Sequence, residues 1–165
     1  MRNYRILFLF LIVSCHSYAQ NKLNLKNQTF VAKVTGVSDG DTMEVLYKNT
    51  RVKIRLAHID CPEKRSAQPF NNEAKITLSN LCFGQMVTVE GEKYDRYQRL
   101  IAVIINKKKQ NVNKEMIKAG MAWHFKKYSK NTEYADLELT ARKNRIGLWK
   151  DPNAVEPWLW RKPKR

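Results

Sequence analysis

The chain has 165 residues, and its hydrophobic fraction of 43% is enough for a packed core, which excludes a wholly disordered protein. Its 31 Lys and Arg residues against 15 Asp and Glu give a formal net charge of +16, which attracts nucleic acid, anionic membranes or other polyanions. Three cysteines are too few for a small domain held together by disulfides.

Residues 1–19 have the pattern of a signal peptide. Two arginines precede an apolar run over 6–13 that is too short to span a bilayer, and small residues at 17 and 19 resemble a cleavage site. The four residues ending at Cys15 also resemble a lipobox, so an alternative is a lipoprotein acylated at Cys15. We therefore expect an exported protein, secreted or periplasmic, with a membrane as partner only if Cys15 is lipidated.

In chain order, the residues that follow predict strands first. Segments 29–37, 42–47 and 51–59 are rich in β-branched residues, and an Asp-Gly turn and a polar turn separate them. The third segment alternates hydrophobic and basic residues, and this parity places Arg55 on the face away from the core.

Helices and two more strands are predicted next. Apolar residues at helical spacing indicate a helix from Phe70 to Leu81 that ends at Gly84. Strands are predicted over 86–90 and 100–105, with a polar loop between them. The remaining predicted elements are a helix over 112–119 capped by Asn111, a helix over 133–146 after Thr132, and an aromatic segment over 157–160 that docks on the domain.

Five short strands with a helix inserted after the third are typical of the OB-fold. We predict an α+β fold, a five-stranded Greek-key OB-fold β-barrel with about three α-helices, over residues 29–160. Residues 20–28 are expected to form a flexible N-terminal segment and 161–165 a basic tail.

Two acidic clusters lie where predicted strands end. Asp39 and Asp41 belong to a tight turn, and their carboxylates are hard oxygen ligands of the kind Ca²⁺ prefers. Asp60 and Glu63 flank Pro62, so that Asp60 can join Asp41 on a cation while Glu63 serves as general base toward a water. A turn former and surface acids are the alternative interpretation of the same residues.

A third cluster, 93–99, interleaves tyrosines with arginines just before a buried strand. Arginine binds phosphate oxygens through paired hydrogen bonds, and aromatic rings stack on nucleobases, although a basic loop is also an ordinary solvated one. Together the three clusters contain what phosphodiester cleavage requires: a cation, a base for water, and guanidinium groups for the charge of the transition state.

In their order and spacing these clusters resemble the staphylococcal nuclease (thermonuclease) family, calcium-dependent secreted nucleases with an OB-fold barrel. The resemblance runs from Phe30 to Arg161. Its markers are Val37-Ser-Asp-Gly-Asp-Thr42, Arg55-(x)4-Asp60-x-Pro-Glu63, Asp95-Arg-Tyr-x-Arg99, Val112-Asn through Ala119-Gly-Met-Ala122, and Gly147-Leu-Trp149.

The resemblance implies a Ca²⁺ site and a catalytic group. Asp41 and Asp60 match the calcium carboxylates, the backbone carbonyl of Cys61 matches a further ligand, and Asp39 stands nearby. Glu63 matches the family's general base.

The resemblance also implies how the substrate is held. Arg55 and Arg99 match the two arginines that grip the scissile phosphate, while Arg96, Tyr97 and Tyr128 match nucleotide-binding positions. The implied activity is hydrolysis of DNA and RNA, single-stranded or frayed strands favoured, to 3′-phosphate products by a monomer without a protein partner.

Two positions depart from the family pattern. Gln98 stands where the family usually has glycine, and a left-handed backbone there would cost about 1–2 kcal/mol. Lys126 replaces an aromatic residue of the nucleotide pocket, which exchanges stacking for charge.

Two other functions remain as alternatives. The barrel is also suited to a non-catalytic nucleic-acid-binding module that uses basic charge and tyrosines. A zinc site from His58, Cys61, Cys82 and His124 matches no standard finger spacing. Two free, buried thiols are the simplest expectation for Cys61 and Cys82, with a disulfide as the alternative in an oxidising compartment.

Overall fold

The structure is a computed structural model that describes residues 23–65 and 67–161. The predicted signal peptide, its cleavage site and Cys15 lie outside the described residues. Within the described ranges, no helix has the length and apolar character needed to cross a bilayer.

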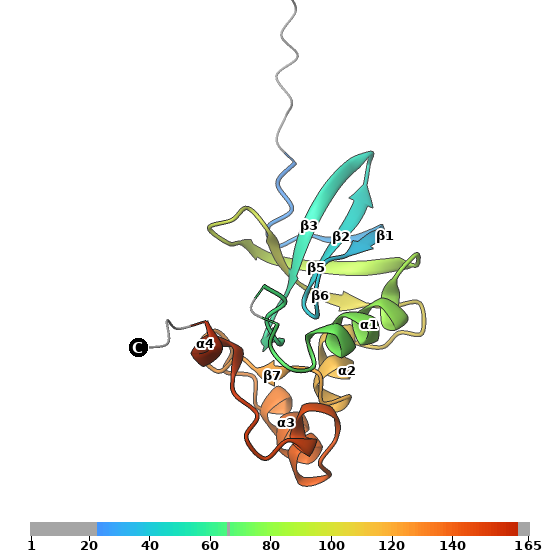
Figure 1. The fold of residues 1–165 in the computed structure, drawn as a ribbon. Coiled ribbons are helices and arrows are strands. Elements are labelled where there is room, and N and C mark those ends of the chain that lie inside the picture. Colours follow the sequence, from blue (N-terminus) through green and yellow to red (C-terminus); the bar gives the residue numbers. More distant parts are fainter. Residues whose placement is uncertain (1–22, 66, 162–165) are drawn as a thin grey trace, which may run out of the picture.

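A closed β-barrel forms one half of the molecule (Figure 1). Its strands are β1 (Thr29–Val37), β2 (Thr42–Tyr47), β3 (Thr50–Leu56), β5 (Met86–Tyr94) and β6 (Leu100–Ile105). Their order around the barrel is β1-β2-β3-β6-β5, with β3 and β6 parallel and the other neighbours antiparallel. The five-stranded α+β barrel predicted from the sequence is confirmed.

Helices gather at one end of this barrel (Figure 1). They are α1 (Asn71–Cys82), α2 (Val112–Lys118), α3 (Thr132–Lys143), the 3₁₀ helix η1 (Gly147–Lys150) and the short α4 (Pro157–Trp160). The side chain of Asn111 accepts a hydrogen bond from the Lys114 N–H and caps α2, as predicted.

A small two-stranded sheet joins the barrel to the helices. It pairs β4 (Ile59–Asp60) with β7 (Trp123–His124), and Asp60 lies opposite Trp123. Close by, the buried side chain of Asn113 on α2 accepts a hydrogen bond from the Ile104 N–H and donates to the carbonyls of Ala57 and Ala102. These contacts fix the chain just after β3, beside Arg55.

Three predicted boundaries differ from the structure. The third strand ends at Leu56 because His58 adopts φ 68°, outside the β region. The strand from Met86 continues through a β-bulge between Gly91 and Lys93 instead of ending at residue 90. The last long helix is α3, which is capped by Asn131 rather than Thr132 and ends at Lys143 rather than residue 146.

Residues 23–28 pack against the barrel, although they were expected to belong to a flexible segment. Leu25 is 4% exposed, and its N–H donates to the hydroxyl of Tyr94, which in turn donates to the Leu23 carbonyl. The Gly91 N–H donates to the Gln28 carbonyl. A Cβ on Gly91 would lie 2.5 Å from the Leu25 carbonyl oxygen, so this close approach requires glycine.

The core fills the barrel and continues into α1 and α2, and a second cluster lies among α3, η1 and β7. Cys61 and Cys82 are both free and buried, as the sequence suggested. Beside the second cluster, the Leu148 N–H donates to the Gly120 carbonyl. This hydrogen bond brings together two of the sequence markers, the one that ends at Ala122 and the one that begins at Gly147.

Candidate functional site

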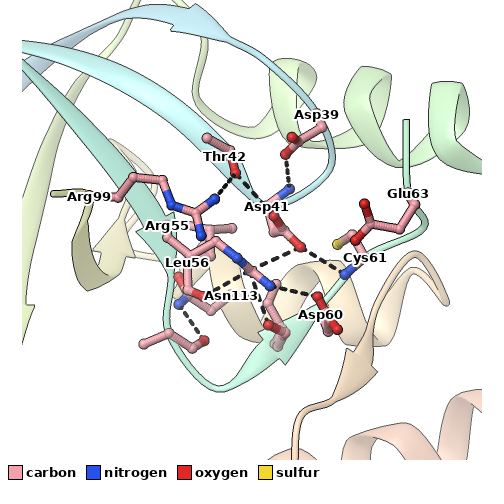
Figure 2. Close-up of polar contacts among 12 residues, drawn as sticks. Asp39, Asp41, Thr42, Arg55, Leu56, Asp60, Cys61, Glu63, Arg99 and Asn113 are labelled. Atoms are coloured by element: carbon pink, nitrogen blue, oxygen red, sulfur yellow. Dashed lines mark hydrogen bonds and ion pairs between the residues drawn. The ribbon is translucent and has the colours of Figure 1, made fainter. Parts of the chain in front are cut away.

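Three of the predicted site residues meet where β2, β3 and β4 approach one another (Figure 2). Arg55 Nη1 lies 2.9 Å from Asp41 Oδ2, and Arg55 Nη2 lies 2.6 Å from Asp60 Oδ1. Asp41 immediately precedes β2, whose first residue, Thr42, pairs with Arg55 in the ladder. The side chain of Arg55 therefore points away from the barrel core, as predicted, and into a pair of carboxylates.

The turn before β2 holds Asp41 through contacts on both sides. Asp39 Oδ1 accepts the Asp41 N–H, and Asp41 Oδ2 accepts the Cys61 N–H at 2.8 Å. Gly40 is required for this packing, because a Cβ there would lie 2.7 Å from the Cβ atoms of Ala74 and Cys61. Asp39 thus stands beside the carboxylate pair without joining it.

Burial shapes the electrostatics of these carboxylates. Asp41 is 7% exposed and Asp60 1% exposed. Burial raises the pKa of Asp41 to about 7 despite the opposing charge of Arg55, and the charges of Asp39 and Asp60 add to the rise. Burial likewise raises the pKa of Asp60 against the pull of its arginine partners. Added positive charge at this point would stabilise both ionised carboxylates.

Arg99 directly precedes β6, and its side chain reaches the same cluster. Its Nε lies 2.8 Å from Asp95 Oδ2, and its Nη1 donates to the hydroxyl of Thr42, which donates to Asp41 Oδ1. Figure 2 shows both guanidinium groups, those of Arg55 and Arg99, beside Asp41. The two predicted arginines therefore lie on one side of the molecule.

Asp95 organises the turn that carries Arg99. Its Oδ1 accepts the N–H groups of Tyr97 and Arg99, each at 2.9 Å. Gln98, the residue in the family's glycine position, adopts φ 61°. The left-handed backbone considered in the sequence analysis is present, and Arg99 still contacts Thr42.

Glu63 lies in the loop after β4 and is fixed by Gln68. The Glu63 N–H donates to Gln68 Oε1 at 3.0 Å, and the Gln68 N–H donates to the Glu63 carbonyl. Figure 2 places the Glu63 carboxylate beside Cys61, on the side where Asp41 lies. The structure thus brings Glu63 to the carboxylate pair.

Arg161 is a site residue that the sequence analysis missed. Its Nη2 lies 2.7 Å from Asp60 Oδ2 and its Nη1 lies 2.6 Å from Glu63 Oε1. The basic tail predicted over 161–165 therefore does not include Arg161 as a free end, because this residue contacts the acidic cluster. Its sequence signal is weak, since a basic residue after an aromatic segment has no periodicity to mark it.

The predicted nucleotide-binding residues are exposed at two places around this cluster. Tyr97 is 64% exposed, with the guanidinium carbons of Arg96 and Arg99 4.8 and 5.6 Å from its ring centre. Tyr128 is also 64% exposed and lines an open pocket of about 520 Å³ that extends to Arg161. The other residues that line this pocket are Phe125, Lys126, Lys127 and Trp158.

The donor set fits a hard cation better than zinc. Among the described residues, no group of three or more His, Cys, Asp and Glu side chains is arranged to hold a metal ion, which argues against the four-residue zinc alternative. A Ca²⁺ ion needs fewer side chains, because carbonyl oxygens and waters complete its shell. Asp41 and Asp60 are two buried carboxylates that face one guanidinium, and carboxylate oxygens are the donors that such an ion prefers.

Comparison with known proteins gives the family. The family model described as "Staphylococcal nuclease homologue" matches residues 53–151. An "Uncharacterized endonuclease" of Haemophilus influenzae is 40% identical over 161 residues, which cover 97% of this chain and 84% of the relative. A "Micrococcal nuclease" of Shigella flexneri is 38% identical over 146 residues, which cover 82% and 83% of the two chains. The chain therefore belongs to the family of staphylococcal nuclease homologues.

Proposed function

We propose that the protein is a calcium-dependent nuclease that hydrolyses phosphodiester bonds of DNA and RNA and leaves 3′-phosphate products. Membership of the staphylococcal nuclease homologues supports nuclease activity in general. The observation that supports the finer proposal is one contact network that joins the carboxylates of Asp41, Asp60 and Glu63 to three guanidinium groups, those of Arg55, Arg99 and Arg161.

Glu63 is the proposed general base. Its carboxylate lies at the edge of the buried pair, with its side chain 24% exposed, so a water has access to it. Glu63 orients the water that attacks phosphorus or accepts a proton from it. Asp41, Asp60 and the backbone carbonyl of Cys61 would hold the calcium ion, which would supply Lewis-acid chemistry at the phosphate.

Arg55 and Arg99 are the proposed phosphate ligands. Both guanidinium groups are fixed before substrate arrives, Arg55 by two carboxylates and Arg99 by Asp95. Donors that are held in place stabilise developing negative charge without reorganising during the reaction. In the proposed in-line attack of water on phosphorus, these two arginines neutralise the negative charge that develops in the transition state.

The exposed tyrosines are proposed to hold the nucleotide. Tyr97 and Tyr128 present their rings to solvent beside Arg96 and Lys127, a combination that stacks on bases and binds phosphates. Stacking requires unpaired bases, so we propose that single-stranded or frayed DNA and RNA are preferred. Export, through the predicted signal, would place the monomeric enzyme where calcium is plentiful.

Digestion of plasmid DNA and of RNA by the protein starting at Gln20 tests the proposal, with calcium and with chelator. We expect cleavage with calcium and none with chelator. Glu63→Gln should lower turnover by about 10²-fold or more, while Glu73→Gln, the same change at an exposed position of α1, should have no effect. Wild-type rates for Glu63→Gln would reject the general base.

The same experiment distinguishes the second candidate, a non-catalytic binding module. The net charge of +16 and the exposed tyrosines suit that function as well. Tight binding of DNA without cleavage in either condition would favour it. Cleavage that persists in chelator would instead reject the calcium assignment.

A further inference from the structure

The last described residue of the chain, Arg161, contacts two acidic residues that lie about one hundred positions earlier. The sequence separation is 101 residues to Asp60 and 98 residues to Glu63. Residues 155–161, called the C-terminal strap below, carry Arg161 to this place. Because the strap contains the short helix α4 and little core of its own, contacts with the rest of the domain must hold it.

Two such contacts anchor the strap. The ring of Trp158 stacks on Phe125, with centres 5.3 Å apart and planes 6° apart. The Gln68 side chain donates from Nε2 to the Val155 carbonyl at 2.7 Å. Gln68 is 2% exposed, so the donor side of this hydrogen bond is held in a buried position.

Gln68 also ties the strap to the backbone of Glu63. The oxygen of its amide accepts the Glu63 N–H while the nitrogen holds Val155. The loop that carries Glu63 and the strap that carries Arg161 are therefore fixed against each other by one buried side chain. Arg161 adds a second connection, this time to the Glu63 carboxylate itself.

We propose that Arg161 is a positioning residue for Glu63. Its guanidinium spans two carboxylates, with Nη2 on Asp60 and Nη1 on Glu63, and so sets the place of the Glu63 carboxylate relative to Asp60. This inference rests on the proposed function, in which Glu63 activates water and Asp60 binds calcium. Asp60 Oδ1 accepts from both Arg55 and Arg161, but Oδ2 accepts from Arg161 alone and keeps a further lone pair for a cation.

The geometry favours this role over that of an ordinary surface ion pair. Asp60 is 1% exposed and is held by Arg55 on its other oxygen, so it offers Arg161 a fixed anchor. Glu63, by contrast, is partly exposed and its carboxylate is free to rotate unless a partner restrains it. Misplacing a catalytic group by about 1 Å can cost 10²-fold in rate.

Steady-state kinetics and calcium titration of Arg161→Ala test the proposal. We expect kcat to fall between about 10- and 100-fold, a larger change than any in the KM for a single-stranded oligonucleotide. Calcium should bind several-fold more tightly by calorimetry without nucleic acid, because a positive charge beside Asp60 is gone. Arg161→Lys should recover part of the rate, since an ammonium pairs with one carboxylate at a time.

Two controls separate positioning from other effects. Lys150→Ala removes the same charge from an exposed position of the C-terminal part and should change neither kcat nor calcium affinity. In a Glu63→Gln background, Arg161→Ala should change kcat by less than about two-fold, because the residue acts through Glu63. Thermal melting confirms that each variant is folded.

Other outcomes would overturn the proposal. A raised kcat in Arg161→Ala would make the contact autoinhibitory, and a raised KM with unchanged kcat would make Arg161 a substrate ligand. An unchanged calcium affinity would show that the guanidinium does not reach Asp60 in solution. If Glu63→Gln keeps the wild-type rate, the proposed function fails together with the positioning role, whereas a silent Arg161→Ala beside an inactive Glu63→Gln rejects the positioning role alone.

Discussion

The carboxylate of Asp41 and the guanidinium of Arg55 form an ion pair that is almost closed to water. Oδ2 and Nη1 are 2.9 Å apart, and the two side chains are 10% and 12% exposed. The β2–β3 ladder fixes the pair, since Arg55 lies opposite Thr42. Burial alone would lower the pKa of Arg55, but Asp41 and Asp60 outweigh it and raise that pKa. Arg55 is therefore a rigid, permanently charged donor.

Arg55→Lys should lower kcat by about 10²-fold, the loss typical of one preorganised donor. A lysine ammonium keeps the charge but cannot address Asp41 and Asp60 with a planar fork. Steady-state cleavage of an oligonucleotide with saturating calcium measures the effect. Arg51→Lys, on the same strand with its side chain 78% exposed, is the control. Equal rates for the Arg55→Lys and control variants would mean that charge alone suffices.

The parts of the fold that the sequence predicts are those with a local signal. The alternation along residues 51–56 predicted that Arg55 points away from the core, and Asn111 predicted the start of α2. Both features depend only on residues that are neighbours in the chain. The contact of Arg161 with Glu63 spans 98 residues and depends on how the strap docks. No periodicity records such a contact, so the sequence analysis missed it.

The predicted ends of two strands were wrong where the backbone forms a bulge or adopts a positive φ, features that the residue types there do not mark. The bulge near Gly91 carries β5 past a residue that usually ends strands, and the positive φ of His58 ends β3 inside an apolar run. The acidic cluster was better anticipated than these boundaries, because its resemblance to a family carries three-dimensional information. Gln68, which holds Glu63, has neither a local pattern nor a motif.

Gly120→Ala should lower the free energy of unfolding by about 3 kcal/mol or more, combining backbone strain with a clash that must be relieved. Gly120 adopts φ +64°, and its Cβ would lie 2.1 Å from the Ile146 carbonyl oxygen. Gly84→Ala is a matched control, because Gly84 has φ +74° but nothing within 4 Å of the added Cβ. That control should lose only about 1 kcal/mol. If urea denaturation shows that both variants lose the same free energy of unfolding, the close approach of Gly120 to the Ile146 carbonyl does not matter for stability.

His124 should lower the free energy of unfolding in mild acid, whereas Asp41, whose pKa is raised to about 7, takes up a proton in the folded protein and acts in the opposite direction over the same range. The His124 side chain is 4% exposed, and burial lowers its pKa in the folded protein below 6.5, although Glu138 opposes the shift. The unfolded chain then binds a proton at His124 more readily than the folded protein does. The stability that the neutral, buried His124 contributes is therefore complete above pH 6.5 and is lost as the pH falls below it.

Urea denaturation across this pH range checks the effect, whose slope is at most about 1.4 kcal/mol per pH unit for one proton. His124→Gln should remove the contribution of His124, so that stability falls less, or rises more, toward acid than in the wild-type protein. His58→Gln is the comparison, the same change at a second histidine, whose Nε2 lies 3.1 Å from Glu92 Oε1. A His124→Gln protein with the wild-type slope would assign the acid sensitivity to other groups.

Two turns of the barrel have the same backbone, and they isolate the effect of Gln98. In the first turn, the Asp95 side chain accepts hydrogen bonds from the N–H groups of Tyr97 and Arg99. In the second, the Asn106 side chain accepts hydrogen bonds from the N–H groups of Lys108 and Gln110. The fourth residue, Gln98 or Lys109, has φ 61° in both. Only the first turn carries a proposed catalytic arginine.

Gln98→Gly and Lys109→Gly should each raise the free energy of unfolding by roughly 0.5–1 kcal/mol. Glycine relieves about 1–2 kcal/mol of left-handed strain and gives back part of it as entropy of the unfolded chain. Turnover should change by less than about two-fold in Gln98→Gly, because Asp95, which is unchanged, fixes Arg99. Denaturation and oligonucleotide cleavage measure both. If Gln98→Gly destabilises while Lys109→Gly stabilises, contacts of the Gln98 side chain outweigh the strain of its backbone.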